Sequence, residues 1–227
     1  MIQLPFADRA EAGRSLAAEL ATRKLPGNVI VLALPRGGLP VGLEVAKKLQ
    51  APLDVVIVRK LGVPWQPELA MGAIASGSVQ TLDRDLIREL NISREDIDAV
   101  IETEKAELER REKLYRRGRP ALDLRGRTAL LVDDGLATGS TMLVAVRYVR
   151  SLKPGRTLVA VPVASVQACE RLKMEADECI CLAMPELFSA VGQWYADFPQ
   201  VSDSEVQRFL EAGRLPVKRN QSELVTR

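Results

Sequence analysis

The chain has 227 residues, of which 47% are hydrophobic and 27% are charged, and its formal net charge is +2. This length suits one α/β domain with an appendage, and the apolar content is enough for a hydrophobic core. The small net charge does not by itself indicate nucleic-acid binding. No segment approaches the roughly 20 apolar residues that span a bilayer, and the N-terminal segment lacks a signal-peptide core, so we expect a cytoplasmic protein.

The composition also limits catalysis and metal binding. The chain has no histidine, which excludes Ser-His-Asp and Cys-His mechanisms. Its three cysteines are Cys169, Cys179 and Cys181, and the last two share a face because they lie two residues apart in a strand-like run. Without histidine or a C-x-x-C pair, the sequence argues against a zinc site.

Hydrophobic periodicity predicts alternating helices and strands. Near-continuous apolar runs indicate strands that are buried on both faces, so we expect an open, mainly parallel five-stranded sheet flanked by helices. Residues 61–71 have the composition of a loop, and residues 83–118 form a charged helical insertion with a break near Asn91. The predicted strands are 28–34, 53–58, 128–132, 157–163 and 178–183, with a short strand or hairpin in 71–81, and the predicted helices are 9–24, 40–50, 140–152, 165–174 and 203–212.

Residues 129–141, ALLVDDGLATGST, carry the strongest functional signal. Four apolar strand residues precede Asp133 and Asp134, and a turn of small residues then leads into a helix. The start of that helix offers unpaired amides and a partial positive charge, which suit a phosphate group. The carboxylates repel each other and suit sugar hydroxyls or a hydrated metal ion. Together these features predict a phosphorylated sugar as ligand, whereas the alternative is an ordinary strand–turn–helix connection.

The run resembles the motif with which type I phosphoribosyltransferases bind phosphoribosyl pyrophosphate (PRPP). The resemblance implies that Asp133 and Asp134 hold the ribose hydroxyls as the catalytic pair. It also implies that a phosphate loop wraps the 5-phosphate. Its residues are Ala137, Thr138, Gly139, Ser140 and Thr141.

Two positions depart from the family pattern. Gly135 stands where the family usually has an aliphatic residue. Ala137 stands where the 6-oxopurine enzymes usually carry an aspartate that acts on the purine. Adenine-type members also lack that aspartate, so the family assignment holds while a 6-oxopurine substrate is less expected.

Polar residues follow two further predicted strands. Since ligands bind at the carboxyl ends of strands in an open parallel sheet, we expect these residues to join the acidic pair in one site. Arg36, Gly37 and Gly38 follow the first core strand, where the resembled family places its pyrophosphate loop, often with an unusual, sometimes cis, peptide. Arg59 and Lys60 either neutralise pyrophosphate or lie in solvent.

The predicted loop 61–70 matches the place where the family has its mobile catalytic flap, with Trp65 and Glu68 as its notable side chains. Residues 110–127 are rich in arginine and lysine, which is one pattern of nucleic-acid binding. Their spacing from Glu107, Glu109 and Glu112 instead favours i,i+4 ion pairs on an exposed helix or a dimer contact.

The C-terminal segment 184–199, MPELFSAVGQWYADFP, holds four of the chain's aromatic residues. Such clustering suits a lid over a flat heterocycle, and we predict an acceptor pocket there. An equally supported alternative is a small core that anchors the final helix. The predicted pocket residues are Phe188, Trp194, Tyr195 and Asp197.

The resemblance covers nearly the whole chain and matches a bacterial branch of predicted phosphoribosyltransferases. It implies a core at 1–183 and a C-terminal hood at 184–227. The implied reaction moves ribose 5-phosphate from PRPP to a nucleobase, related heterocycle or amine, with release of pyrophosphate. Mg²⁺ is the implied cofactor, with Asp133 and Asp134 holding it through water. We expect a homodimer and no membrane or nucleic-acid partner.

The alternative is a non-catalytic regulator that senses PRPP, or a nucleic-acid-binding protein. No helix-turn-helix precedes the domain in this sequence, which weakens that alternative.

Overall fold

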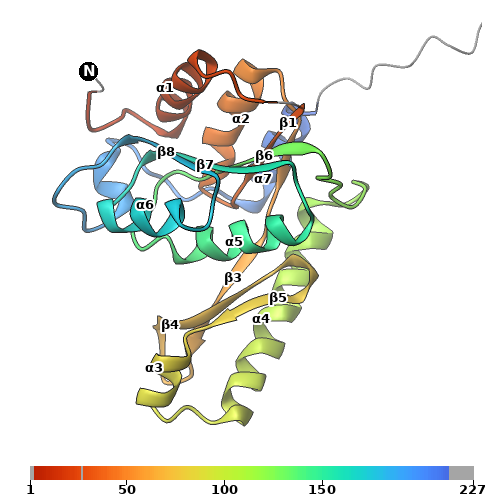
Figure 1. The fold of residues 1–227 in the computed structure, drawn as a ribbon, viewed down its shortest axis with the longest axis vertical. Coiled ribbons are helices and arrows are strands. Elements are labelled where there is room, and N and C mark those ends of the chain that lie inside the picture. Colours follow the sequence, from red (N-terminus) through yellow and green to blue (C-terminus); the bar gives the residue numbers. More distant parts are fainter. Residues whose placement is uncertain (1–2, 27, 215–227) are drawn as a thin grey trace, which may run out of the picture.

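The computed structural model describes residues 3–26 and 28–214 (Figure 1). Its centre is a parallel sheet of five strands in the order β2-β1-β6-β7-β8, so the predicted sheet is confirmed. The tail from residue 215, including that part of the predicted hood, lies outside the described residues. The strands are β1 (Asn28–Ala33), β2 (Leu53–Val55), β6 (Arg127–Val132), β7 (Arg156–Val163) and β8 (Glu178–Ala183).

Helices cover both faces of this sheet (Figure 1). On one face lie α1 (Arg9–Thr22) and α2 (Gly38–Leu49), and on the other lie α5 (Ser140–Ser151) and α6 (Val166–Lys173). The strands are apolar at consecutive positions because each face meets a core. In β1, Val31 and Ala33 join the core under α1 and α2, while Ile30 and Leu32 join the core over α5 and α6.

A second lobe projects from the sheet (Figure 1). It holds an antiparallel sheet of β3 (Val58–Val63), β4 (Gln66–Ala75) and β5 (Val79–Leu82), with the short 3-10 turn η1 (Ser76–Ser78). Helices α3 (Arg84–Glu89) and α4 (Arg94–Tyr115) complete the lobe and confirm the predicted insertion and its break. Ser93 begins α4 by accepting a hydrogen bond from the Asp96 amide.

Two predictions in this region are wrong. The predicted strand 53–58 ends at Val55 in the main sheet, so Arg59 and Lys60 lie within β3 of the second sheet. The predicted loop 61–71 is instead a hairpin of β3 and β4. Prolines and a glycine suggested a loop, but in the structure Gly62 lies at an irregular register of β3, Pro64 lies in the hairpin turn and Pro67 lies in β4.

Several residues of the basic stretch that starts at residue 110 are paired within the chain. Arg111 donates to Glu107 at 2.7 Å, as its spacing predicts. Arg116 instead turns to Asp54 at 3.1 Å, and Arg119 donates to the carbonyl of Leu53 at 2.8 Å. These contacts favour a structural use of the basic residues.

The C-terminal segment returns to the N-terminus. The 3-10 turn η2 (Val191–Trp194) leads to Tyr195, which forms a β-bridge with Phe6, and α7 (Asp203–Ala212) then packs against α2 and α4. Ser202 and Glu205 form a capping box that begins α7. Among the described residues, no helix combines the length and the apolar character that a bilayer crossing requires.

Candidate functional site

The acidic pair lies directly after β6, with the two carboxylates in different environments. The Asp133 carboxylate accepts a hydrogen bond from the Asp134 amide at 2.9 Å. The Asp134 carboxylate accepts one from Arg9 Nε at 2.8 Å, and its side chain is 13% exposed. Burial, followed by repulsion from Asp134, raises the pKa of Asp133 well above its usual value. Burial also raises the pKa of Asp134, and Arg9 opposes that rise.

Arg9 is a site residue that the sequence analysis missed. It is buried at the start of α1, donates from Nη1 to the carbonyl of Pro199 at 2.7 Å, and lies 3.7 Å from the centre of the Phe198 ring. The Tyr195 hydroxyl donates to the backbone carbonyl of Asp134. Asp134 is therefore held by a residue of α1 and by a residue of the C-terminal segment. No local pattern around Arg9 signals this contact, because its partner lies 125 residues away.

The predicted pyrophosphate loop lies against the acidic pair. A Cβ added at Gly37 would lie 2.1 Å from Asp134 Oδ2, and one at Gly38 would lie 2.8 Å from the carbonyl of Val132. Only glycine permits this close approach of the two loops. The Pro35–Arg36 peptide is cis, as the family resemblance suggests. The guanidinium of Arg36 lies 3.6 Å from Asp203 of α7 and is 37% exposed.

The predicted phosphate loop surrounds a small hollow of about 140 Å³. Lys60, Asp133 and the run from Gly135 to Met142 line it, so the structure brings Lys60 to the phosphate loop. Gly139, at φ 72°, precedes the first turn of α5, whose amides are free of helical partners. Helix α6 supports the loop from behind: Ser165 Oγ donates to the carbonyl of Ala137 at 2.6 Å.

A larger hollow of about 650 Å³ lies between the β3–β4 hairpin and α4. Lys60 and Thr141 line it as well as the small hollow, so the two adjoin. Arg59 also lines it but is paired with Glu104 at 2.6 Å. Of the two predicted flap residues, Glu68 lines the larger hollow, while Trp65 lies in the hairpin turn and is 60% exposed.

The four predicted acceptor-pocket residues lie in different environments. Tyr195 is buried against Phe6, and its hydroxyl donates a hydrogen bond to Asp134. Both its ring and its hydroxyl therefore already have partners within the protein. Phe188 and Trp194 are half-buried neighbours with ring centres 6.0 Å apart, and the indole nitrogen of Trp194 is buried without a hydrogen-bond partner. The Asp197 side chain is exposed, while its amide donates to Ala7.

The alternative prediction is that this aromatic cluster anchors the final helix, but the cluster packs on other residues. It packs on Phe6, Ala12 and Val163, whereas α7 buries its apolar residues in the core under α1 and α2. The cluster also explains why Gly135 replaces the usual aliphatic residue. A Cβ there would lie 2.7 Å from Val191 Cγ1 of the C-terminal segment.

Comparisons with known proteins identify the family of this chain. The family profile of the phosphoribosyl transferase domain matches residues 8–198. Two Mycobacterium tuberculosis proteins, "Putative phosphoribosyl transferase MT0597" (strain CDC 1551) and "Putative phosphoribosyl transferase Rv0571c" (strain H37Rv), are each 50% identical over 207 residues, which is 91% of this chain. The match covers 46% of each relative, so this chain spans about half of their length.

A solved structure is also similar along almost its whole length. The protein TT1426 from Thermus thermophilus is 43% identical with a TM-score of 0.77, and the match covers 91% of this chain and 98% of that one. The protein described here therefore belongs to the phosphoribosyl transferase domain family.

Proposed function

We propose that the protein transfers ribose 5-phosphate from PRPP to a nitrogen acceptor and releases pyrophosphate. The observation that carries this proposal is the contact between two loops that follow different strands. The Gly37–Gly38 turn lies against the acidic pair, and Asp133 of that pair also lines the phosphate-loop hollow. Donors for a phosphate and acceptors for sugar hydroxyls thus adjoin, as one phosphorylated sugar requires.

Each element has a role in this reaction. Amides at the start of α5 hold the 5-phosphate. Asp133 and Asp134 hold the ribose hydroxyls and stabilise the positive charge that develops at C1 in an oxocarbenium-like transition state. Lys60 makes no ion pair among the described residues and attracts the departing pyrophosphate. Arg59 does the same once pyrophosphate replaces Glu104 as its ion-pair partner.

The donor set fits Mg²⁺, which prefers carboxylate and phosphate oxygens. Arg9 pairs with Asp134, whereas Asp133 makes no ion pair among the described residues. Asp133 and Asp134 would hold the ion through water. The bound ion supplies positive charge to the leaving pyrophosphate.

The acceptor is proposed to be a nucleobase, a related heterocycle or an amine that approaches along the C-terminal segment. Phe188 and Trp194 are the candidates for stacking, because both are half-buried and Trp194 has an unpaired indole N–H. Tyr195 is better explained as a support of Asp134. A homodimer and a cytoplasmic location stay predictions.

Turnover separates this proposal from a PRPP-sensing regulator or a nucleic-acid-binding protein. Purified protein is incubated with PRPP, Mg²⁺ and a panel of nucleobases, other heterocycles and amines, and pyrophosphate release is measured. We expect release with at least one acceptor and none from the Asp133→Asn, Asp134→Asn double variant.

Ligand-induced stabilisation supplies the second measurement. Saturating PRPP with Mg²⁺ should raise the melting temperature by mass action. An unchanged melting temperature would contradict the site assignment. A raised melting temperature without turnover on any acceptor would favour the regulator.

A further inference from the structure

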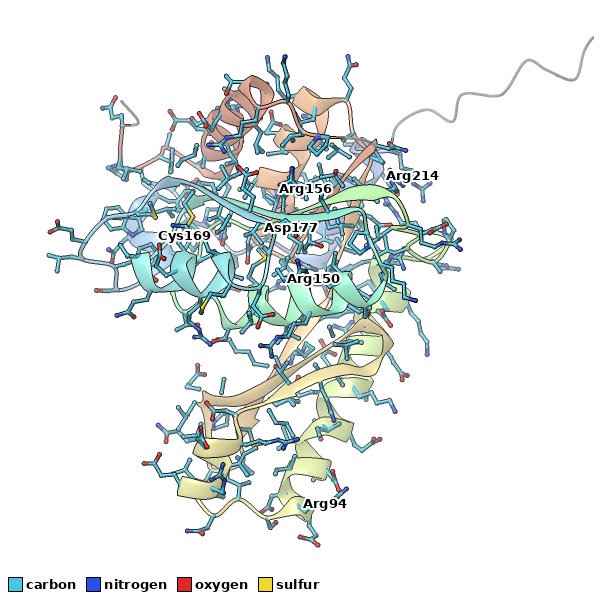
Figure 2. All side chains as sticks on the ribbon, viewed as in Figure 1. Arg94, Arg150, Arg156, Cys169, Asp177 and Arg214 are labelled. Atoms are coloured by element: carbon cyan, nitrogen blue, oxygen red, sulfur yellow. A yellow bond between two sulfur atoms is a disulfide. The ribbon has the colours of Figure 1, made fainter. Side chains whose placement is uncertain are left out.

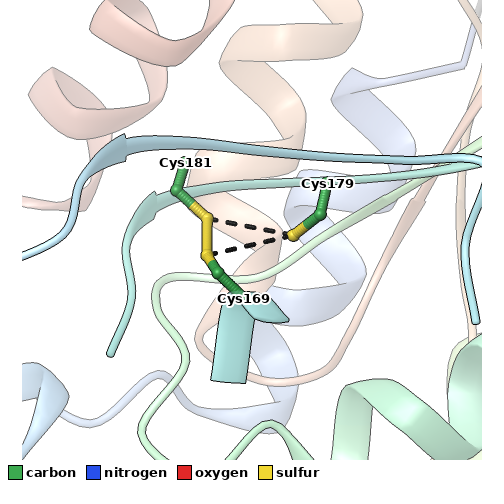
Figure 3. A group of neighbouring side chains, drawn as sticks. All are labelled: Cys169, Cys179 and Cys181. Carbon is green, nitrogen blue, oxygen red and sulfur yellow. Dashed lines mark hydrogen bonds between the residues drawn. A yellow bond between two sulfur atoms is a disulfide. The ribbon is translucent and has the colours of Figure 1, made fainter. Parts of the chain in front are cut away.

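All three cysteines of the chain converge between α6 and β8 (Figure 3). Cys169 comes from α6 (Figure 2) and is 1% exposed, whereas Cys179 and Cys181 come from β8 and are half-buried. Their three Sγ atoms lie within 4.8 Å of one another. The sequence argument against a metal site considered spacing along the chain, and the fold adds a third thiol from another element.

A disulfide alone does not account for this arrangement. The structure joins Cys169 to Cys181, and the free Cys179 thiol lies 4.0 Å from Cys169 Sγ and 3.9 Å from Cys181 Sγ. A disulfide leaves this third sulfur without a role. The Cα atoms of Cys169 and Cys181 are also 7.5 Å apart, beyond the roughly 4.4–6.8 Å usual for disulfides.

We propose that Cys169, Cys179 and Cys181, when reduced, bind one thiophilic metal ion of the zinc class as three thiolates. Tetrahedral coordination with zinc–sulfur bonds of about 2.3 Å places ligand sulfurs roughly 3.8 Å apart. The distances from Cys179 to the other two sulfurs, 4.0 and 3.9 Å, are close to that value, and reduction of the Cys169–Cys181 bond lets these two sulfurs separate to the same spacing. The partial exposure of Cys179 and Cys181 leaves the fourth position open to water.

The charges around the cluster are compatible with such an ion. A dication that binds a thiol displaces its proton and stabilises the thiolate directly. Three thiolates and one dication leave a single negative charge, and the nearby Lys173 ammonium is paired with Glu170 at 2.7 Å. The bound ion would tie α6 to the edge strand β8.

The test titrates metal into the full chain after reduction by a phosphine under nitrogen. Zn²⁺ is measured by competition with a chromophoric chelator, and Cd²⁺ by its thiolate charge-transfer absorption. We expect one ion per chain and a higher melting temperature with metal. Forming the Cys169–Cys181 disulfide by oxidation before the titration should abolish metal binding.

Cys179→Ser is the decisive variant, because it keeps the Cys169–Cys181 pair intact. Its metal affinity should fall by more than about 100-fold, beyond the 10–100-fold that loss of an outer contact gives. Met174→Ser, at an 80% exposed position after α6, is the matched control and should bind like the parent. Cys169→Ser and Cys181→Ser should each lose binding as well, with folding of every variant checked by circular dichroism.

Two results would overturn the proposal. Reduced parent protein that binds neither Zn²⁺ nor Cd²⁺ at micromolar concentration has no such site. Parent-like affinity in Cys179→Ser would show that two thiols suffice and that the third is incidental. If Cys179→Ser does not fold, the Cd²⁺ absorption per chain of the parent decides, since its intensity reports how many thiolates bind.

Discussion

Asp133 lies beside a second carboxylate at a buried strand end, and this position affects stability. Its pKa lies well above the ordinary 3.8, first because of burial and then because of Asp134. The folded state therefore binds this proton more tightly than the unfolded state does. The free energy of unfolding should fall as pH rises from about 4 through the folded-state pKa, and level off above it.

Asp133→Asn should remove this pH-dependent fall in the free energy of unfolding, and it keeps an Oδ1 acceptor for the Asp134 amide. We expect the variant to be more stable than the parent at neutral pH, with the difference shrinking toward pH 4. Turnover should drop by at least about 100-fold, because charge stabilisation of the transition state is lost. Urea unfolding across pH, together with pyrophosphate release, measures both effects. Equal pH dependence in variant and parent would contradict the electrostatic argument.

Arg9 is expected to keep Asp134 ionised. In Arg9→Met the pKa of Asp134 should rise further, since its ion pair at 2.8 Å is gone. The acid limb of the kcat/KM profile should then move to higher pH, with partial restoration in Arg9→Lys, which keeps the charge but not the planar contact with Phe198. Arg14→Met, at an exposed position on the same helix, is the control. An unmoved acid limb would leave Arg9 with a packing role only.

At the scale of elements, the C-terminal segment combines packing with a proposed pocket. Trp194→Ala should raise the KM of the acceptor about tenfold or more while that of PRPP changes little, given roughly 1–3 kcal/mol for each stacked ring. Some stability should be lost too, because Trp194 packs on the core around Phe6. Leu187→Ala, 85% exposed, is the control. A large stability loss with equal effects on both KM values would reject the pocket.

The elements of the main sheet, apart from the end of β2, and the helices of the second lobe could be predicted closely, whereas the β3–β4 hairpin could not. Runs such as 128–132 and 157–163 are apolar at nearly every position because helices cover both faces, so burial alone marks them as strands. The β3–β4 hairpin has no such mark: residues 66–68 of β4 are exposed, and its prolines signal a turn. Pairing between its two strands, which local composition does not encode, makes it a sheet.

At the scale of the whole molecule, the N-terminal segment around Phe6 and the C-terminal segment around Tyr195 meet beside the acidic pair and close the chain on itself. The Phe6 amide donates to the carbonyl of Trp194 at 2.9 Å, and the Ala196 amide donates to that of Phe6 at 2.7 Å. The Phe6 ring is 2% exposed and lies 5.8 Å from the Tyr195 ring. Closure of the chain thus fixes Tyr195, and through it the backbone of Asp134.

Phe6→Ala should therefore reduce both stability and turnover, although Phe6 does not touch the acidic pair directly. We expect a loss of about 3–5 kcal/mol in the free energy of unfolding, as for other buried phenylalanines. Tyr195→Phe, which removes only the hydroxyl contact with Asp134, should lose less stability while turnover still falls. Urea midpoints and initial rates of the two variants test this. Full activity in both would show that the closure does not position the acidic pair.

The sequence by itself determined what contiguous residues encode. The acidic pair, the phosphate loop and the alternation of strands with helices are local patterns, since burial and helix ends impose them residue by residue. Only the tertiary structure decided which distant groups meet: Arg9 with Asp134 across 125 residues, Lys60 with the phosphate loop, and Cys169 with the two thiols of β8. These contacts follow from how the helices and the chain ends pack on the sheet, and a one-dimensional pattern carries no record of that packing.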